Sequence, residues 1–199
     1  MNSDSDAVFP TTIKTFFPTW DNFIKHIAVE NFVTDLDGFN GDYGINNLYL
    51  YRWTNSSQLT FIPSDKSEAF KATPNGSLSP GNPTLSIFNH ILDGDPARRI
   101  RLSGRAMTQD VARNLYLDTL LAIANVVMAL DPKNPADTRG WMEREIEREY
   151  ALNKDAVSSD TKRPFTNADF ENDVENLRVY ARTRADNVIT QVNNFRAGR

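Results

Sequence analysis

The sequence predicts a mainly α-helical domain (class α+β) that carries one small antiparallel β-hairpin. Apolar residues recur at the 3-and-4 spacing of an amphipathic helix in several stretches along the chain. Residues 47–62 differ, because two short runs of alternating aromatic and aliphatic side chains flank the polar residues 54–58. That arrangement is typical of two strands joined by a hairpin turn.

The composition of the chain limits the classes of protein to which it can belong. A chain of 199 residues, with 40% hydrophobic and 24% charged residues, can bury the core of one soluble globular domain. A net charge of −4 argues against nucleic-acid binding that is driven by bulk charge. The absence of cysteine excludes disulfides, zinc–thiolate sites and thiol catalysis. Because no run of about 18 apolar residues occurs, we expect no membrane span. The first residues also lack the pattern of a signal peptide.

The N-terminal elements follow from local pattern. Residues 1–18 are polar and are broken by Pro10 and Pro18, so we expect a lead-in with little regular structure. A helix should begin at Thr19, and an acidic loop should follow it. Strands are expected at about 47–53 and 59–62, and a surface loop at 72–83. The buried stripe predicted for the helix consists of Trp20, Phe23, Ile24, Ile27, Ala28 and Phe32.

The C-terminal elements are predicted to be helices. One should begin at Asn82-Pro83, with Asn as the cap and Pro at the first helical position, and run to about residue 92. A long apolar helix over about 109–130 should be the most buried. A charged helix over 141–152 should precede a loop at 155–164, and the last helix should open with a capping box formed by Thr166 and Asp169. The arginines of residues 97–105 indicate a solvated surface or, alternatively, a contact with an acidic partner or phosphate.

Three oxygen-bearing residues in the stretch 35–70 form the candidate site. Asp37 lies in the acidic loop, Asn47 starts the first strand, and Asp65 lies just past the second strand. A hairpin can bring these three together at one end. Carboxylate and amide oxygens suit Mg²⁺ or Mn²⁺. A carboxylate beside such a metal can orient an attacking hydroxyl in phosphoryl transfer.

The same stretch carries a family resemblance in three segments of matching order and spacing. These are Asp37-Gly38-Phe39, then Asn47-Leu48-Tyr49-Leu50-Tyr51, and then Phe61-Ile62-Pro63-Ser64-Asp65, with Phe70 close behind. They resemble the kinase domain of the CotH family, the spore coat protein H kinases. The C-terminal helices extend the likeness over roughly residues 20–195.

The resemblance implies an atypical protein kinase with a kinase-like helical C-lobe. Asp37 would be catalytic, orienting and deprotonating a Ser or Thr hydroxyl of a protein substrate in the spore coat or at the cell surface. Asn47 and Asp65 would hold Mg²⁺ (or Mn²⁺) on ATP. Residues 19–199 would correspond to the C-terminal half of the family domain as a single lobe, with the N-terminal nucleotide-binding lobe absent. Because neither G-x-G-x-x-G nor a P-loop occurs here, we expect the chain to be inactive alone.

Three departures from the family pattern favour a second hypothesis. Ser64, Ser67 and Lys71 stand where the family has Trp, a second Asp and Gly. They favour a non-catalytic binding or scaffold module, similar to a pseudokinase, in the spore coat or at the cell surface.

Other interpretations of these residues remain open. Asp37 and Asp65 could serve only as turn-forming or helix-capping residues. A calcium loop over residues 35–42 fits poorly, because Phe39 occupies a ligand position of the EF-hand spacing. His26 and His90 are more simply partly exposed surface histidines than acid–base catalysts.

Overall fold

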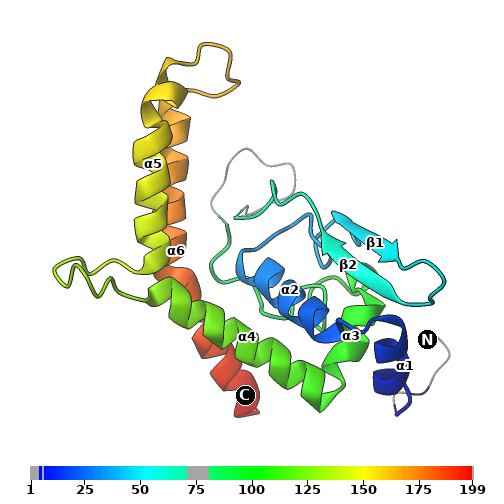
Figure 1. Ribbon diagram of the computed structural model, residues 1–199. Coiled ribbons are helices and arrows are strands. Elements are labelled where there is room, and N and C mark those ends of the chain that lie inside the picture. The colour runs from blue at the N-terminus through cyan, green and yellow to red at the C-terminus, as the bar shows by residue number, and fades with distance from the viewer. Residues whose placement is uncertain (1–4, 6, 71–80, 199) are drawn as a thin grey trace.

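The computed structural model describes residues 5, 7–70 and 81–198. Helices dominate and one two-stranded antiparallel sheet accompanies them, so the predicted fold class is confirmed at this level (Figure 1). The predicted loop at 72–83 and the position Lys71 lie almost wholly outside the described residues. The elements are α1 (Phe9–Phe16), α2 (Trp20–Phe32), β1 (Leu48–Arg52), β2 (Leu59–Pro63), the 3₁₀ helix η1 (Pro96–Arg98), α3 (Arg101–Met107), α4 (Asp110–Met128), α5 (Trp141–Ser159) and α6 (Asn167–Arg196).

Helix α2 is the centre of the lobe. All six residues of its predicted apolar stripe are buried, and the helix packs against α4. The prediction that α4 is the most buried helix is wrong. Helix α4 contacts α2, α3, α5 and α6, but Val111 is 77% exposed and Val126 is 57% exposed on its other side. The apolar residues of α4 are therefore shared between the core and the surface.

Helix α4 is long and apolar enough, by length and composition, to cross a membrane. Its residues Tyr116, Leu117 and Leu120 are buried within the helical lobe. Packing of this face against the neighbouring helices accounts for the apolar character that we find.

The expectation of an irregular lead-in is wrong for residues 9–16, which form helix α1. Pro10 lies in the first turn of this helix, where the missing N–H has no intrahelical acceptor to lose. Phe9 and Ile13 are buried, and the Phe9 ring meets Trp20 edge-on at a centroid distance of 6.1 Å. Burial of these two side chains thus recruits the segment into the core.

The helix predicted over residues 82–92 is also absent, and the segment consists of turns. Its apolar residues Ile87, Phe88 and Ile91 are nevertheless buried. Side chains of α6 satisfy its carbonyls in place of helical bonds: Arg184 donates to the main-chain oxygens of Pro83 (3.1 Å) and Leu85 (2.6 Å). Tertiary contacts have replaced the helix that the local sequence favours.

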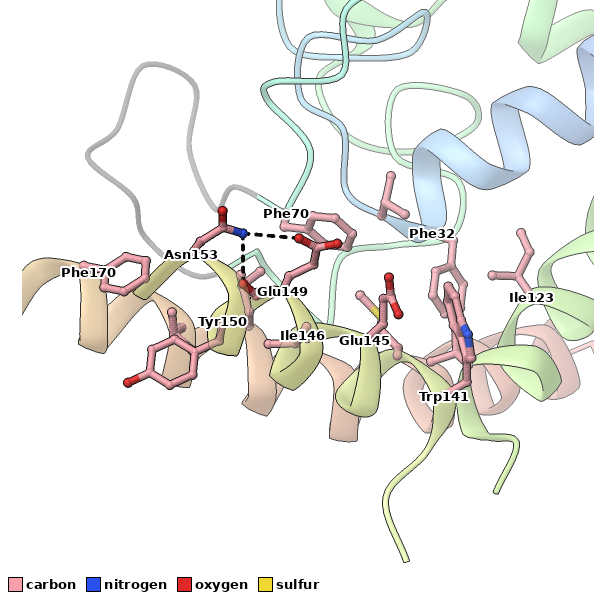
Figure 2. A pocket seen from close by; sticks show the side chains of 15 residues that line it. Phe32, Phe70, Ile123, Trp141, Glu145, Ile146, Glu149, Tyr150, Asn153 and Phe170 are labelled. Atoms are coloured by element: carbon pink, nitrogen blue, oxygen red, sulfur yellow. Dashed lines mark hydrogen bonds between the residues drawn. The ribbon is translucent and has the colours of Figure 1, made fainter. Parts of the chain in front are cut away.

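Helix α5 and the first part of α6 lie side by side and project from the lobe as an arm, and the C-terminal part of α6 packs against α4 (Figure 1). Helix α5 continues to Ser159, beyond the predicted end, and the predicted capping box of Thr166 and Asp169 is confirmed at the start of α6. An apolar groove of about 500 Å³ separates the arm from the lobe, with Trp141 and Ile146 from α5 facing Phe32 and Phe70 (Figure 2). None of the described residues that line this groove belongs to the loop or hairpin that carries the candidate site.

Candidate functional site

The hairpin of β1 and β2 rests on α2 through one aromatic residue. The strands pair in antiparallel register, with Leu48 opposite Pro63 and Leu50 opposite Phe61. The Phe61 ring meets Phe23 of α2 edge-on at 5.4 Å and Phe39 of the acidic loop at 5.9 Å. Such ring contacts fix the hairpin against both α2 and the loop.

Asp37 and Asn47 are in direct contact at the base of the hairpin. The side-chain amide of Asn47 donates hydrogen bonds to Asp37 Oδ2 at 2.8 Å and to its main-chain oxygen at 2.9 Å. The amide of Asn46 donates to Asp37 Oδ1 at 2.6 Å. Asn47 has a φ of 53°, in the left-handed region that asparagine tolerates better than most residues. Both oxygens of the half-buried Asp37 carboxylate are thereby oriented.

Asp65 is linked to this pair through the backbone. The main-chain N–H of Ser64 donates to the main-chain oxygen of Asn47 at 2.9 Å, which places the segment after β2 beside Asn47. The exposed Asp65 carboxylate accepts the N–H of Ser67 at 3.0 Å, and this bond holds the pKa of Asp65 below its usual value. Among the described residues, no hydrogen bond joins the Asp65 side chain to Asp37 or Asn47. The structure therefore brings Asp37 and Asn47 together, with Asp65 as a neighbour whose side chain caps a turn.

A charge cluster with two buried carboxylates lies beside the acidic loop and was not foreseen from the sequence. Lys66 Nζ lies 2.6 Å from Glu30 Oε1 and 3.0 Å from Asp35 Oδ2. The side chains of Glu30 and Asp35 are 4% and 0% exposed, and His26 Nε2 is 2.8 Å from Glu30 Oε1. We call Glu30, Asp35 and Lys66 the loop-anchoring cluster. It joins α2, the acidic loop and the segment after β2.

The same two carboxylates set the path of the loop that presents Asp37. Glu30 Oε2 accepts the N–H of Phe39 at 2.9 Å, and Asp35 Oδ1 accepts the N–H of Asp37 at 3.2 Å. Gly38 passes close above them, since a Cβ at this position would lie 2.7 Å from Glu30 Cδ. The glycine is thus required by close approach to the cluster.

Burial and charge shift the protonation of the loop-anchoring cluster. Burial by itself would raise the pKa of Glu30, but the hydrogen bonds and charges of His26 and Lys66 outweigh it, so this pKa is lowered. Burial dominates at Asp35 and raises its pKa despite the opposing contact with Lys66. Burial disfavours the charged Lys66, yet its two carboxylate partners raise its pKa above the usual value. Lys66 therefore stays charged at neutral pH.

The interpretation of the two histidines as partly exposed surface residues is wrong for His90, which is buried, whereas His26 is partly exposed. The His26 side chain is 17% exposed, bonds Glu30 and packs on the ring of Phe61 at 4.9 Å. His90 is 5% exposed, and its Nε2 lies 2.5 Å from Asp42 Oδ1. The i,i+4 spacing of His26 and Glu30 was the one local signal for such a contact. His90 thus contacts the acidic loop directly, and His26 contacts Glu30, which accepts the N–H of Phe39 in that loop.

Comparison with protein-family models matches the one described as CotH kinase protein, over residues 1–188. The chain belongs to the CotH kinase family. The resemblance inferred from the sequence is confirmed, and the match takes in α1, which the sequence patterns had left outside the likeness. Searches of curated proteins and of solved structures returned no match.

The residues of the candidate site are compatible with a divalent ion that takes most of its ligands from elsewhere. In the described ranges, no group of three His, Cys, Asp or Glu side chains could hold a metal by itself. Asp37 and Asn47 instead offer one carboxylate and one amide oxygen, and Asp65 offers a second carboxylate beside them. Mg²⁺ binds through one or two carboxylates and keeps waters or phosphate oxygens as further ligands. This donor set is compatible with that mode of binding.

Proposed function

We propose that this chain is the metal-binding and catalytic lobe of a CotH-type protein kinase, which transfers the γ-phosphate of ATP to a Ser or Thr hydroxyl. The family match supports the reaction class. The observation that carries the assignment to a site is the Asp37 carboxylate, half-buried and oriented by Asn47 at the base of the hairpin. Phosphoryl transfer depends mainly on such positioning and on neutralisation of charge.

Each residue has a distinct role in this proposal. Asp37 orients the acceptor hydroxyl and takes its proton, while the hydroxyl oxygen bonds to the γ-phosphorus and the bond to ADP breaks. Asn47 and Asp65 would hold Mg²⁺ or Mn²⁺, which neutralises phosphate charge when bound. Before it can bind an ion, the Asp65 carboxylate has to exchange its contact with the Ser67 N–H for that ion. Glu30 and Asp35 keep the loop in place without touching the substrate.

We further propose that residues 19–199 act as one lobe that needs a second, nucleotide-binding lobe. The sequence holds neither a glycine-rich phosphate loop of the kinase type nor a P-loop. Lys66 is engaged by two buried carboxylates rather than offered to a phosphate. The isolated chain should therefore bind Mg²⁺–ATP weakly and transfer phosphate at a negligible rate.

One observation favours the alternative of a non-catalytic binding module in the spore coat or at the cell surface. Ser67 stands where the family has a second Asp, and its N–H engages the one remaining carboxylate, that of Asp65. In such a site one of the two family carboxylates is replaced by Ser67, and the other, Asp65, accepts a hydrogen bond within its own turn. A site of this kind resembles the site of a pseudokinase.

The decisive experiment fuses the chain to the N-terminal lobe of an active CotH-family kinase. Transfer of ³²P from labelled ATP to a Ser/Thr-rich protein is measured with Mg²⁺ or Mn²⁺. We expect transfer by the fusion, loss in Asp37→Asn and in Asp65→Asn, and retention in the control Asp155→Asn, which changes an exposed carboxylate of α5. An inactive fusion that Ser67→Asp restores would support the binding module. Rapid transfer by the isolated chain would overturn the two-lobe proposal.

A further inference from the structure

The hairpin exposes an aromatic face that covers nothing in the described structure. Tyr49 is 66% exposed, Tyr51 49% and Trp53 52%, and Ile62, opposite Tyr49 in the register, is 44% exposed. The rings of Tyr51 and Trp53 meet edge-on at 5.3 Å, so they share one side of the hairpin. We call Tyr49, Tyr51, Trp53 and Ile62 the aromatic face. Its opposite side carries Phe61, which packs on α2.

The outer edge of β1 is open to pairing. Ser64 N–H bonds to Asn47 and Trp53 N–H bonds to Gln58, so residues 47, 49, 51 and 53 turn their main-chain groups toward β2. The alternation of an antiparallel ladder then directs the main-chain groups of Leu48, Leu50 and Arg52 outward. Within the described ranges, these three form no main-chain hydrogen bond to a residue outside the hairpin.

The two edges of the hairpin are not equivalent. The outer edge of β2 includes Pro63, which has no N–H to donate, and this makes it a poor partner for another strand. The edge of β1 contains no proline, and four of the five residues of β1 are exposed. An incoming strand is therefore accepted better along β1.

The open edge leads directly to the candidate catalytic residue. Strand β1 begins one residue after Asn47, and Asn47 contacts Asp37 at 2.8 Å. At a rise of about 3.3 Å per residue, a strand paired along all of β1 extends about 17 Å from this point. One end of such a strand reaches the level of Asn47, whose side chain contacts Asp37.

We propose that β1 binds an extended segment of the protein substrate as a third strand, with the acceptor Ser or Thr at the Asn47 end. Main-chain hydrogen bonds to Leu48, Leu50 and Arg52 provide affinity, and alternate apolar side chains of the segment extend the aromatic face. This combination of a backbone ladder with alternating side-chain contacts is how sheet edges capture peptides. The inference rests on the proposed function only for the chemistry of the acceptor; the docking itself needs neither ATP nor metal.

The docking specifies a substrate pattern. The segment carries β-branched or aromatic residues at every second position, since these fit a pleated surface. They lie on one side of the acceptor only, because β1 extends from Asp37 in one direction. Tyr and Trp side chains give large contact area at a small cost in conformational entropy, which suits a docking face.

The test is an NMR titration of the full chain, without nucleotide or metal. The probe is a synthetic peptide of about nine residues, with alternating Val and Thr and one terminal Ser. The matched probe has proline at every second position and cannot form the ladder. We expect the first probe to shift the amide signals of Leu48, Leu50 and Arg52, and the proline probe to have no effect. Equal binding of the two probes, shifts centred elsewhere, or no binding would overturn the proposal.

Protein variants provide the second arm. Tyr49→Ser and Tyr51→Ser, at exposed positions, should each weaken binding of the Val/Thr probe about tenfold. Leu152→Ser removes a side chain that is 67% exposed on α5 and should leave binding unchanged. The alternative occupant of β1 is a second copy of the chain, and light scattering tests for it. A dimer that Tyr49→Ser dissociates would show that β1 pairs with a second copy and would overturn the proposal.

The two proposals fail separately. If the chain and its Asp37→Asn variant both bind the Val/Thr probe but the fusion transfers no phosphate, the docking inference stands and the proposed function is contradicted. If the fusion transfers phosphate but the probe does not bind at β1, the proposed function stands and the docking inference is contradicted.

Discussion

The side-chain amide of Asn47 donates to Asp37 twice, at 2.8 Å to the carboxylate and at 2.9 Å to the main-chain oxygen. Asn47, which directly precedes β1, thus ties the acidic loop to the base of the hairpin. The bond fixes the direction of the Asp37 carboxylate, and it makes the site depend on a residue that is itself held at positive φ.

Replacing Asn47 should cost more than replacing its neighbour. Asn47→Ala removes both bonds to Asp37 and places alanine at a φ of 53°, so we expect a loss of about 1–3 kcal/mol in the free energy of unfolding. Asn46→Ala removes one exposed bond and should cost less than about 0.5 kcal/mol. Urea denaturation compares the two. Equal losses would show that the Asn47 contact does not hold the loop.

Lys66→Met should destabilise the protein through the two carboxylates that it leaves behind. Removing one partner of a buried ion pair costs about 3–5 kcal/mol. Because the Lys66 side chain is 35% exposed, we expect about 2–3 kcal/mol at neutral pH. The matched control is Leu152→Met, at an exposed position, which should have little effect on stability.

The pH dependence of Lys66→Met follows from Asp35. Burial raises the pKa of Asp35 and Lys66 opposes that rise, so the pKa should increase further in the variant. The folded variant then binds a proton more tightly than the unfolded chain does. Its stability relative to the wild type should therefore increase as the pH falls through the folded pKa of Asp35. Urea midpoints measured from neutral to mildly acidic pH give the sign, and a deficit that widens on acidification would contradict it.

Arg184 should be irreplaceable by lysine. Its fully buried guanidinium donates to the main-chain oxygens of Asn31 (2.9 Å), Phe32 (3.1 Å), Pro83 (3.1 Å) and Leu85 (2.6 Å). Arg184→Met removes all four of these bonds, while Tyr180 and Gln191 still donate to the oxygens of Phe32 and Leu85, and it should cost more than about 3 kcal/mol. Arg184→Lys should recover little, because an ammonium cannot reproduce the planar fork. Thermal unfolding measures both variants, and a lysine variant of wild-type stability would contradict this account.

The parts of the fold that the sequence predicted are those decided by neighbours along the chain. The apolar stripe of α2 follows from its 3-and-4 periodicity, and the hairpin follows from alternation around a polar turn. The two residues of the capping box, Thr166 and Asp169, are only three positions apart. Each of these signals is complete within a short window.

The errors arose where distant residues decide the outcome. Residues 82–92 stay irregular because Arg184, about a hundred positions away, binds their carbonyls. Lys66 joins Glu30 across 36 positions, and no local pattern records that contact. At the site, the sequence placed Asn47 beside Asp37, but it could not show that Asp65 turns its carboxylate to the N–H of Ser67.

The most direct test of the central claim is paramagnetic broadening by substoichiometric Mn²⁺ in the NMR spectrum of the full chain. If Asn47 and Asp65 hold a divalent ion beside Asp37, broadening should centre on the side-chain amides of Asn46 and Asn47, disappear in Asp65→Asn and persist in Asp155→Asn. Broadening that centres on α5, or that survives Asp65→Asn at the hairpin, would contradict the assignment of the metal site.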